Sequence, residues 1–166
     1  MPARRSIAVS PTGDMVIQQA NSDLEILAVL LNDGTSPKTG AKLLEKATVD
    51  EMFRNQIPQL PDFAREPLPA AKKWLTNPIP DLHPAHNGEV QGYGLSFMLT
   101  GSATGRTAGS AYWSGLSNCF WWCDREKGIA GMVTTQTLPL GDMNAFGLWG
   151  GVEMAVYGEL ASAQKL

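Results

Sequence analysis

The pattern of apolar positions is clearest in the second half of the chain. Two runs rich in aromatic and β-branched residues, Leu116–Cys123 and Ile129–Thr135, flank the polar, glycine-ended connection Asp124–Gly128. This pattern predicts a β-hairpin. Side chains alternate along a strand, which places Cys119, Trp121 and Cys123 on one face and Phe120 and Trp122 on the other. Because both faces are apolar, we expect the hairpin in the middle of a sheet that is covered on each side.

Helical spacing predicts two helices in the first third of the chain. Leucines recur with a helical period over Ser22–Leu31, after the polar start Asn21–Asp23 and before the glycine stop at Gly34. A shorter helix is predicted over Val49–Asn55, where Thr48 and Glu51 have the spacing of a capping box.

Gln91–Leu99 alternates well enough to predict a third strand, and a long helix is predicted over Asn144–Leu160 with Asp142 or Asn144 as its cap. The helix contains three glycines, Gly147, Gly150 and Gly151. Each costs about 1 kcal/mol relative to alanine, so we expect them to mark a close approach to the sheet.

Two segments predict little regular structure. Residues 1–19 are interpreted as an irregular N-terminal segment with at most a short strand over Met15–Ile17, and residues 57–88 contain seven prolines around a turn at 70–75. We find no repeat and no internal boundary, so residues 20–166 are taken as one unit. The expected fold class is α+β, with an antiparallel sheet of 91–99, 116–123 and 129–136 flanked by the two longer helices.

Composition narrows the partners. The chain has 166 residues, is 43% hydrophobic and 17% charged, and has a net charge of −3. A chain of this length and apolar content can form a hydrophobic core. Its negative net charge disfavours binding to nucleic acid or to an anionic membrane, which leaves small-molecule or protein partners. The sequence contains no signal-peptide pattern and no apolar membrane span, so we expect a cytoplasmic protein. The cysteines Cys119 and Cys123 lie too far apart on one strand for a disulfide and are interpreted as free core thiols.

Three short motifs are interpreted as coincidences. Lys38-Thr39-Gly40 copies a triplet of penicillin-recognising serine enzymes but lies in an expected turn, and Ser162 and Lys165 have serine-x-x-lysine spacing at a fraying end. His83 and His86 are expected to be solvated, because no further ligands accompany them. No phosphate loop, dinucleotide fingerprint or metal-ligand pattern is found, so no cofactor and no metal are predicted.

Small residues surround Trp113 in the segment Ser110–Gly115. Such a segment permits an open sheet edge, where backbone N–H groups can face a substrate carbonyl as in an oxyanion hole. The alternative from residue types alone is that Trp113 is a core aromatic residue before a turn.

Several segments also carry a family resemblance. They are Ala20–Leu24, Leu31–Gly34, Thr48–Phe53, Gln91–Leu95, Trp113–Gly115, Cys123–Gly131 and Thr135-Gln136. Their order and spacing over residues 18–160 resemble the C-terminal half of the serine β-lactamase-like superfamily, in particular its class-C-like esterases and the fungal transesterases related to the statin side-chain acyltransferase. The resemblance implies a partial β-lactamase/transpeptidase-like fold and an ester or acyl substrate.

In that family, the backbone of a tryptophan-glycine-glycine triplet completes the oxyanion hole. The resemblance places Trp113, Ser114 and Gly115 at these positions, with Ser114 in place of the usual glycine. The family's nucleophilic serine-x-x-lysine and its tyrosine-x-asparagine motif lie upstream of this region and have no counterpart here, so no catalytic residue is assigned.

Three hypotheses follow. The first is a portion of a serine hydrolase or acyltransferase, of esterase or transesterase type, that is inactive alone and needs a complementing N-terminal half. The second is a non-catalytic binding or interaction protein derived from that fold. The third is a small complete hydrolase that uses the residues interpreted above as coincidences.

Overall fold

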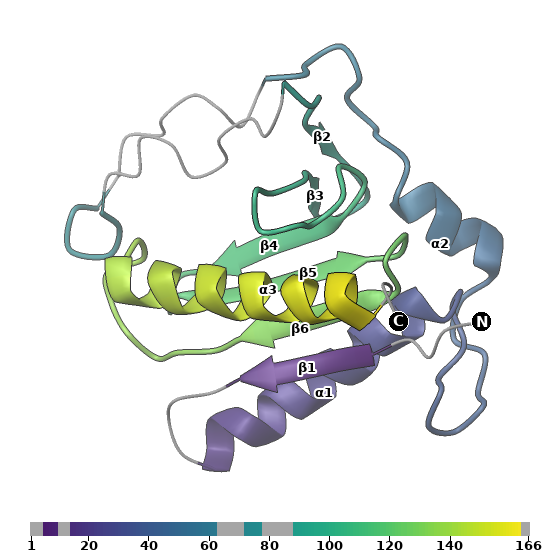
Figure 1. Ribbon diagram of the computed structural model, residues 1–166, viewed down its shortest axis with the longest axis horizontal. Coiled ribbons are helices and arrows are strands. Elements are labelled where there is room, and N and C mark those ends of the chain that lie inside the picture. Colours follow the sequence, from purple (N-terminus) through teal and green to yellow (C-terminus); the bar gives the residue numbers. More distant parts are fainter. Residues whose placement is uncertain (1–4, 10–13, 63–71, 78–87, 164–166) are drawn as a thin grey trace.

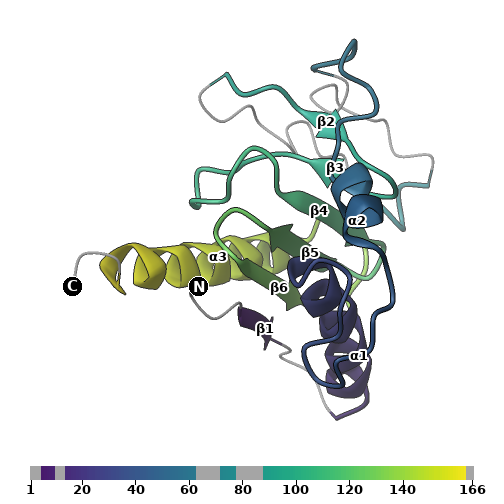
Figure 2. The same cartoon turned by 90° about the vertical axis from the view of Figure 1, so that its right-hand side faces the viewer.

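The computed structural model describes residues 5–9, 14–62, 72–77 and 88–163. The elements are β1 Arg5–Val9, α1 Asp14–Leu31, α2 Lys46–Met52, β2 Gly92–Tyr93, β3 Met98–Leu99, β4 Ala111–Gly115, β5 Cys119–Asp124, β6 Ile129–Val133 and α3 Met143–Ala163. The strands form one sheet in the order β1-β6-β5-β4-β3-β2. Helix α3 crosses one face of the sheet, and α1 and α2 lie over the other (Figures 1 and 2). The predicted α+β class is confirmed.

The central hairpin is confirmed as β5 and β6. These strands pair antiparallel, with Asp124 opposite Ile129. Trp122 is fully buried on the α3 face, whereas Cys123 and the partly buried Trp121 pack on the α1 face. The alternation predicted for this strand is therefore correct, and a helix covers each face.

The predicted strand Gln91–Leu99 is wrong as a single element. Its two ends form β2 and β3, which pair antiparallel with each other. The residues between them turn back, and the Gly94 N–H donates to the Phe97 carbonyl at 2.8 Å. Ser96, within this turn, has a left-handed backbone with φ 80. Tyr93 lies opposite Met98 and shares its face of the sheet, which puts Leu99 on the other face, so the alternation of 93, 95, 97 and 99 does not run through the segment.

The turn between β4 and β5 contains a buried asparagine. Asn118 has φ 54, and its side-chain amide donates to the carbonyls of Thr137 and Pro139, each at 2.9 Å. Its Oδ1 accepts from two backbone N–H groups in front of α3. The predicted strand Leu116–Cys123 therefore begins later than expected: its first residues belong to this turn, and β5 begins at Cys119.

The N-terminal segment is more regular than predicted. Residues 5–9 form β1, which pairs in parallel with β6, so the sheet is antiparallel except at this edge. Helix α1 begins at Asp14, and the Met15–Ile17 triplet is therefore helical. The predicted start at Asn21–Asp23 is also wrong, because these residues lie inside the helix.

The predicted glycine stop of α1 is confirmed. The Gly34 N–H donates to the Val29 carbonyl at 2.9 Å, which closes the last turn. Gly34 has φ 92, and a Cβ at this position would lie 2.1 Å from the Leu44 carbonyl oxygen. Glycine is the residue that meets both requirements.

The second predicted helix forms three residues earlier than expected. Helix α2 has Glu45 as its N-cap, without a side-chain cap bond. Thr48 lies inside the helix, and Glu51 binds Arg54 instead of closing a capping box. The helix is held by burial, because Val49 is fully covered beneath α1.

Helix α3 is the long helix predicted near the C-terminus. Asp142 caps it as predicted, with Oδ1 accepting from two backbone N–H groups at 2.9 Å. The explanation offered for Gly147, Gly150 and Gly151 is wrong: a Cβ at any of them would meet nothing within 4 Å. Gly147 and Gly151 are exposed and Gly150 is half-buried, so these glycines do not mark a close approach to the sheet.

The α3 face is densely packed. Trp149 stacks on Tyr112 and on Phe120, with ring centroids 5.1 and 4.9 Å apart. Beside these rings, the fully buried Glu153 accepts from Arg106 Nη1 at 3.0 Å and from Trp149 Nε1 at 2.8 Å. A buried carboxylate with several donors fixes the helix against the loop that precedes β4.

The α1 face combines an aliphatic layer with ionic contacts at its rim. The buried apolar residues that form this layer are Leu24, Leu27, Leu30, Leu31, Val49, Phe97, Leu99, Ala111, Cys123, Ala130 and Met132. At the rim, Arg125 donates to Asp33 at 2.7 Å and to Asp50 at 2.8 Å, with its guanidinium 5.1 Å from the Phe53 ring centroid. Arg125 joins the hairpin to α2 and to the turn that follows α1. None of the helices in the described ranges combines the length and apolar character that a membrane crossing requires.

Candidate functional site at the end of strand β4

The tripeptide predicted as the substrate-facing edge lies at the end of β4. Trp113, Ser114 and Gly115 pair with β5. On the other side of β4, the ladder with β3 in the described residues covers Ala111 and Tyr112. The tripeptide therefore extends past the end of β3, on a stretch of sheet edge that no strand of the described residues covers, here called the free edge.

Backbone alternation gives the direction of the amides at this edge. The Ser110 carbonyl accepts from Thr100 and so points toward the β3 side of β4. In an antiparallel strand the N–H and C=O of one residue point to the same side, and every second residue repeats that direction. The Ser114 N–H thus points toward the β3 side, whereas the Gly115 carbonyl accepts from Asn118 on the β5 side.

Ser96 explains why the ladder stops. Met98 pairs with Tyr112, so continuing the register would place Ser96 opposite Ser114. Ser96 instead has a left-handed backbone with φ 80, which is incompatible with an extended strand. The chain leaves the sheet at this residue, and no β3 strand continues beside Ser114 in the described part of the chain.

Trp113 is not a core residue. Its side chain is 42% exposed, and its ring contacts the Tyr93 ring edge-on, with centroids 5.7 Å apart. The core interpretation offered from residue types is therefore wrong. Trp113 leaves a large aromatic surface open beside the free edge.

Tyr112, the side chain that is hydrogen-bonded to Ser114, is a poor base. Burial raises the pKa of Tyr112 to about 12, and a hydrogen bond with the Ser114 side chain opposes this shift only in part. At neutral pH the tyrosine is protonated and cannot take a proton from the Ser114 hydroxyl.

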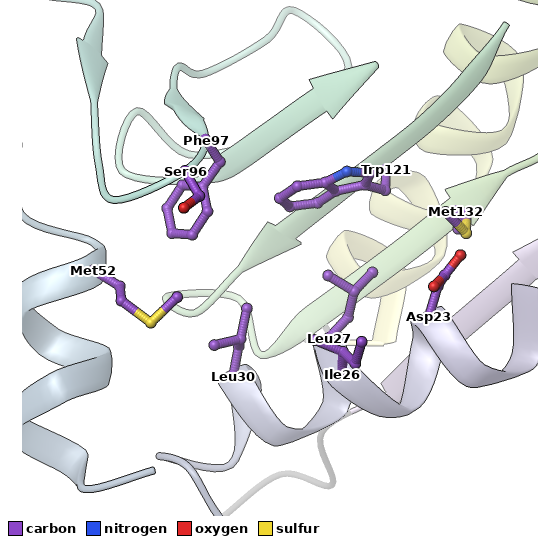
Figure 3. A pocket seen from close by; sticks show the side chains of 9 residues that line it. All are labelled: Asp23, Ile26, Leu27, Leu30, Met52, Ser96, Phe97, Trp121 and Met132. Carbon is purple, nitrogen blue, oxygen red and sulfur yellow. The ribbon is translucent and has the colours of Figure 1, made fainter. Parts of the chain in front are cut away.

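A cavity of about 350 Å³ lies on the α1 face of the sheet (Figure 3). Its lining residues are Asp23, Ile26, Leu27, Leu30, Met52, Ser96, Phe97, Trp121 and Met132. Ser96, Phe97 and Met52 lie toward one end, and Asp23 and Met132 toward the other. Trp121 pairs directly with Trp113 across β4 and β5, so the cavity lies one strand away from the tripeptide.

Of the sequence motifs interpreted as coincidences, the structure describes Lys38 and Ser162, and each makes its contact elsewhere. Lys38 lies in a turn and forms an exposed ion pair with Glu25 at 2.5 Å. The Ser162 hydroxyl donates to the Gly158 carbonyl of its own helix at 2.9 Å. Lys165, His83 and His86 lie outside the described residues.

Sequence reasoning missed the contribution of the β2–β3 turn. Ser96 ends the β3–β4 ladder and lines the cavity, whereas alternation predicts a single strand through this residue. Gly92 and Gly94 within a nine-residue strand were the available signal, because glycine inside a strand often marks a bulge or a reversal. The carboxylate of Asp23 was likewise taken for a helix start.

No family model matches the chain. Among curated proteins, acyltransferase calJ of Penicillium decumbens is 32% identical over 117 residues, which are 70% of this chain and 26% of the relative. The chain thus spans about a quarter of the length of that relative.

Solved structures extend the comparison. Unliganded simvastatin synthase (LovD) from Aspergillus terreus has a TM-score of 0.59 at 24% identity, over 83% of this chain and 34% of the other. The LovD9 mutant of the same enzyme has a TM-score of 0.59 at 23% identity, over 82% and 33%. At this level of identity, the structural similarity establishes the fold alone. Taken with the sequence match, it makes this chain a relative of the β-lactamase-like acyltransferases that corresponds to the C-terminal part of their fold.

Proposed function

We propose that this chain provides the oxyanion-binding sheet edge of a serine acyltransferase or esterase, and that the nucleophile comes from residues outside this sequence. The observation behind the proposal is the Ser114 N–H, which points to the free side of β4 where the ladder with β3 has ended. A donor fixed in this way can stabilise the negative charge that develops on an ester or thioester carbonyl oxygen. The substrate would lie along the exposed Trp113 ring.

The proposed dependence on an external nucleophile follows from the serines of this chain. An attacking hydroxyl needs a nearby base with a suitable pKa. The Ser162 hydroxyl donates a hydrogen bond to the Gly158 carbonyl of its own helix, which is not a base, and the high pKa of Tyr112 excludes this neighbour of Ser114 as a base. An oxyanion donor without a nucleophile can polarise a carbonyl but cannot form an acyl-enzyme.

Hydrolysis of a p-nitrophenyl ester tests the proposal. The isolated chain should show no turnover above a nucleophile-free background. Turnover should appear when the chain is mixed with a polypeptide that carries the serine-x-x-lysine and tyrosine-x-asparagine part of a related acyltransferase. A burst from the isolated chain that disappears in Ser162→Ala would overturn the assignment and favour a small complete hydrolase.

Two variants address the donor itself. Ser114→Pro removes the proposed N–H on the free side of β4, where proline is tolerated. In the mixture it should lower turnover by about two orders of magnitude, the usual effect of losing one oxyanion donor. Ser114→Gly keeps the N–H and should retain turnover. Equal rates for both variants would exclude Ser114 as the donor, and ester binding without turnover in any mixture would favour a non-catalytic binding protein.

A further inference from the structure

The cavity on the α1 face has a composition suited to one kind of ligand. Aliphatic and aromatic side chains from α1, α2 and the sheet form most of its wall. Among the residues whose side chains the structure describes, the lining contains no lysine, arginine or histidine, and Asp23 places a carboxylate at one end (Figure 3). We propose that this cavity binds the neutral aliphatic chain of the acyl group whose carbonyl lies at Ser114. This inference rests on the proposed function and adds the substrate class.

Ser96 connects the two parts of the site. It lines the cavity, and it lies two residues before Met98, which pairs with Tyr112, two residues before Ser114. The left-handed residue at which the chain leaves the ladder is therefore also part of the cavity wall. An acyl group with its carbonyl at the Ser114 N–H has its chain directed past Ser96 onto the faces of Phe97 and Trp121.

The volume of the cavity and the charge of its lining limit the kind of acyl chain that it can bind. A volume of about 350 Å³ is near the lower end of the roughly 300–1,000 Å³ typical of ligand pockets, so it suits an acyl chain rather than an entire large ester. Each methylene group that leaves water for the apolar wall favours binding. A negatively charged chain end would meet the Asp23 carboxylate without a compensating cation in the lining, so neutral chains are preferred.

A pair of matched probes tests the inference by direct binding to the isolated chain. Methyl octanoate has a neutral chain end, and monomethyl octanedioate has the same ester with an anionic end. Calorimetry or ligand-observed NMR should show saturable binding of methyl octanoate and at least about tenfold weaker binding of monomethyl octanedioate. Asp23→Asn should reduce this difference. Absence of binding by methyl octanoate, or equal affinity for the two probes, would overturn the inference.

A cavity-filling variant locates the binding. Ile26 lines the cavity but is 60% exposed, so Ile26→Trp can fill the space with little cost to the core. It should weaken binding of methyl octanoate at least about tenfold. The matched control is Met154→Trp, which adds the same ring at a 58% exposed position on α3, across the sheet. It should leave the affinity unchanged, and equal effects of the two variants would place the probe elsewhere.

The binding tests and the turnover tests can fail separately. Binding of methyl octanoate that is lost in Ile26→Trp, together with no turnover in any mixture, retains the cavity assignment and rejects the acyltransferase proposal. Turnover that is restored by mixing but is insensitive to Ile26→Trp rejects the cavity assignment alone. Loss of methyl octanoate binding when a complementing polypeptide with its nucleophilic serine replaced by alanine is added would also reject it, because the ester is then not consumed and a protein segment would occupy the cavity.

Discussion

The two faces of the sheet are built from alternate residues of the same strands but differ in how completely they are filled. On the α3 face, Trp122, Tyr112 and Phe120 are fully buried, and aromatic stacking and a bonded carboxylate leave little space. On the α1 face, Trp121 is only partly buried and lines a cavity. Ionic contacts of Arg125 hold the covering helices at the rim.

The two faces therefore have different roles: the α3 face holds the strands rigidly, and the α1 face leaves space for a ligand. The filled α3 face holds β4 and β5 in place, so the Ser114 amide has a fixed direction. The α1 face keeps space beside the same strands, where a ligand can enter. A binding site needs both, because a donor that must reorganise stabilises charge poorly and a completely filled face admits no substrate.

The largest expected effect compares two adjacent tryptophans. Trp122→Ala should lower the free energy of unfolding by about 3–5 kcal/mol, since it empties a fully buried position on the α3 face. Trp121→Ala, on the α1 face, should cost clearly less because its side chain already borders a cavity. Urea denaturation of both variants measures the difference. Equal losses would show that the two faces are packed to the same extent.

The next effect concerns alkaline pH. The folded-state pKa of Tyr112 is raised from 10.0 to about 12 by burial, so its contribution to stability is complete below pH 10 and is lost as the pH rises. The loss should reach about 2 kcal/mol by pH 12. Tyr112→Phe cannot ionise and should show a shallower decline between pH 10 and 12 than the wild type. Parallel declines would mean that Tyr112 is not buried as described.

The smallest effect concerns the rim of the α1 face. Arg125→Ala should lower stability by about 1 kcal/mol, because Arg125 is partly exposed and solvent screens its ion pairs. The difference from wild type should shrink at high salt. Arg54→Ala removes an exposed pair with Glu51 within one helix turn and serves as the control, with no measurable loss expected. A loss for Arg125→Ala as small as that of the control would mean that the rim contacts do not hold α1 and α2.

Local patterns in the sequence were sufficient to predict several elements of the fold. The β5–β6 hairpin and the end of α1 at Gly34 were predicted correctly, and Asp142 was one of the two residues predicted as the cap of α3. Each depends on neighbours a few residues away: alternation along a strand, a left-handed glycine, or a carboxylate beside free N–H groups. The tripeptide Trp113–Gly115 was located by small residue types and by resemblance, and its role stays a proposal.

Only the tertiary structure decided the features that depend on pairing between distant segments. The parallel pairing of β1, the split of 91–99 into two strands and the outward position of the α3 glycines involve contacts that a local period does not encode. The same holds for the free edge at Ser114 and for the cavity beside it. The sequence by itself determined which residues alternate along β5 and that α1 stops at Gly34, because these preferences act within a few residues. Which strand ends opposite Ser114, and what space remains under α1, were decided by register and packing, because these join residues that are far apart in the chain.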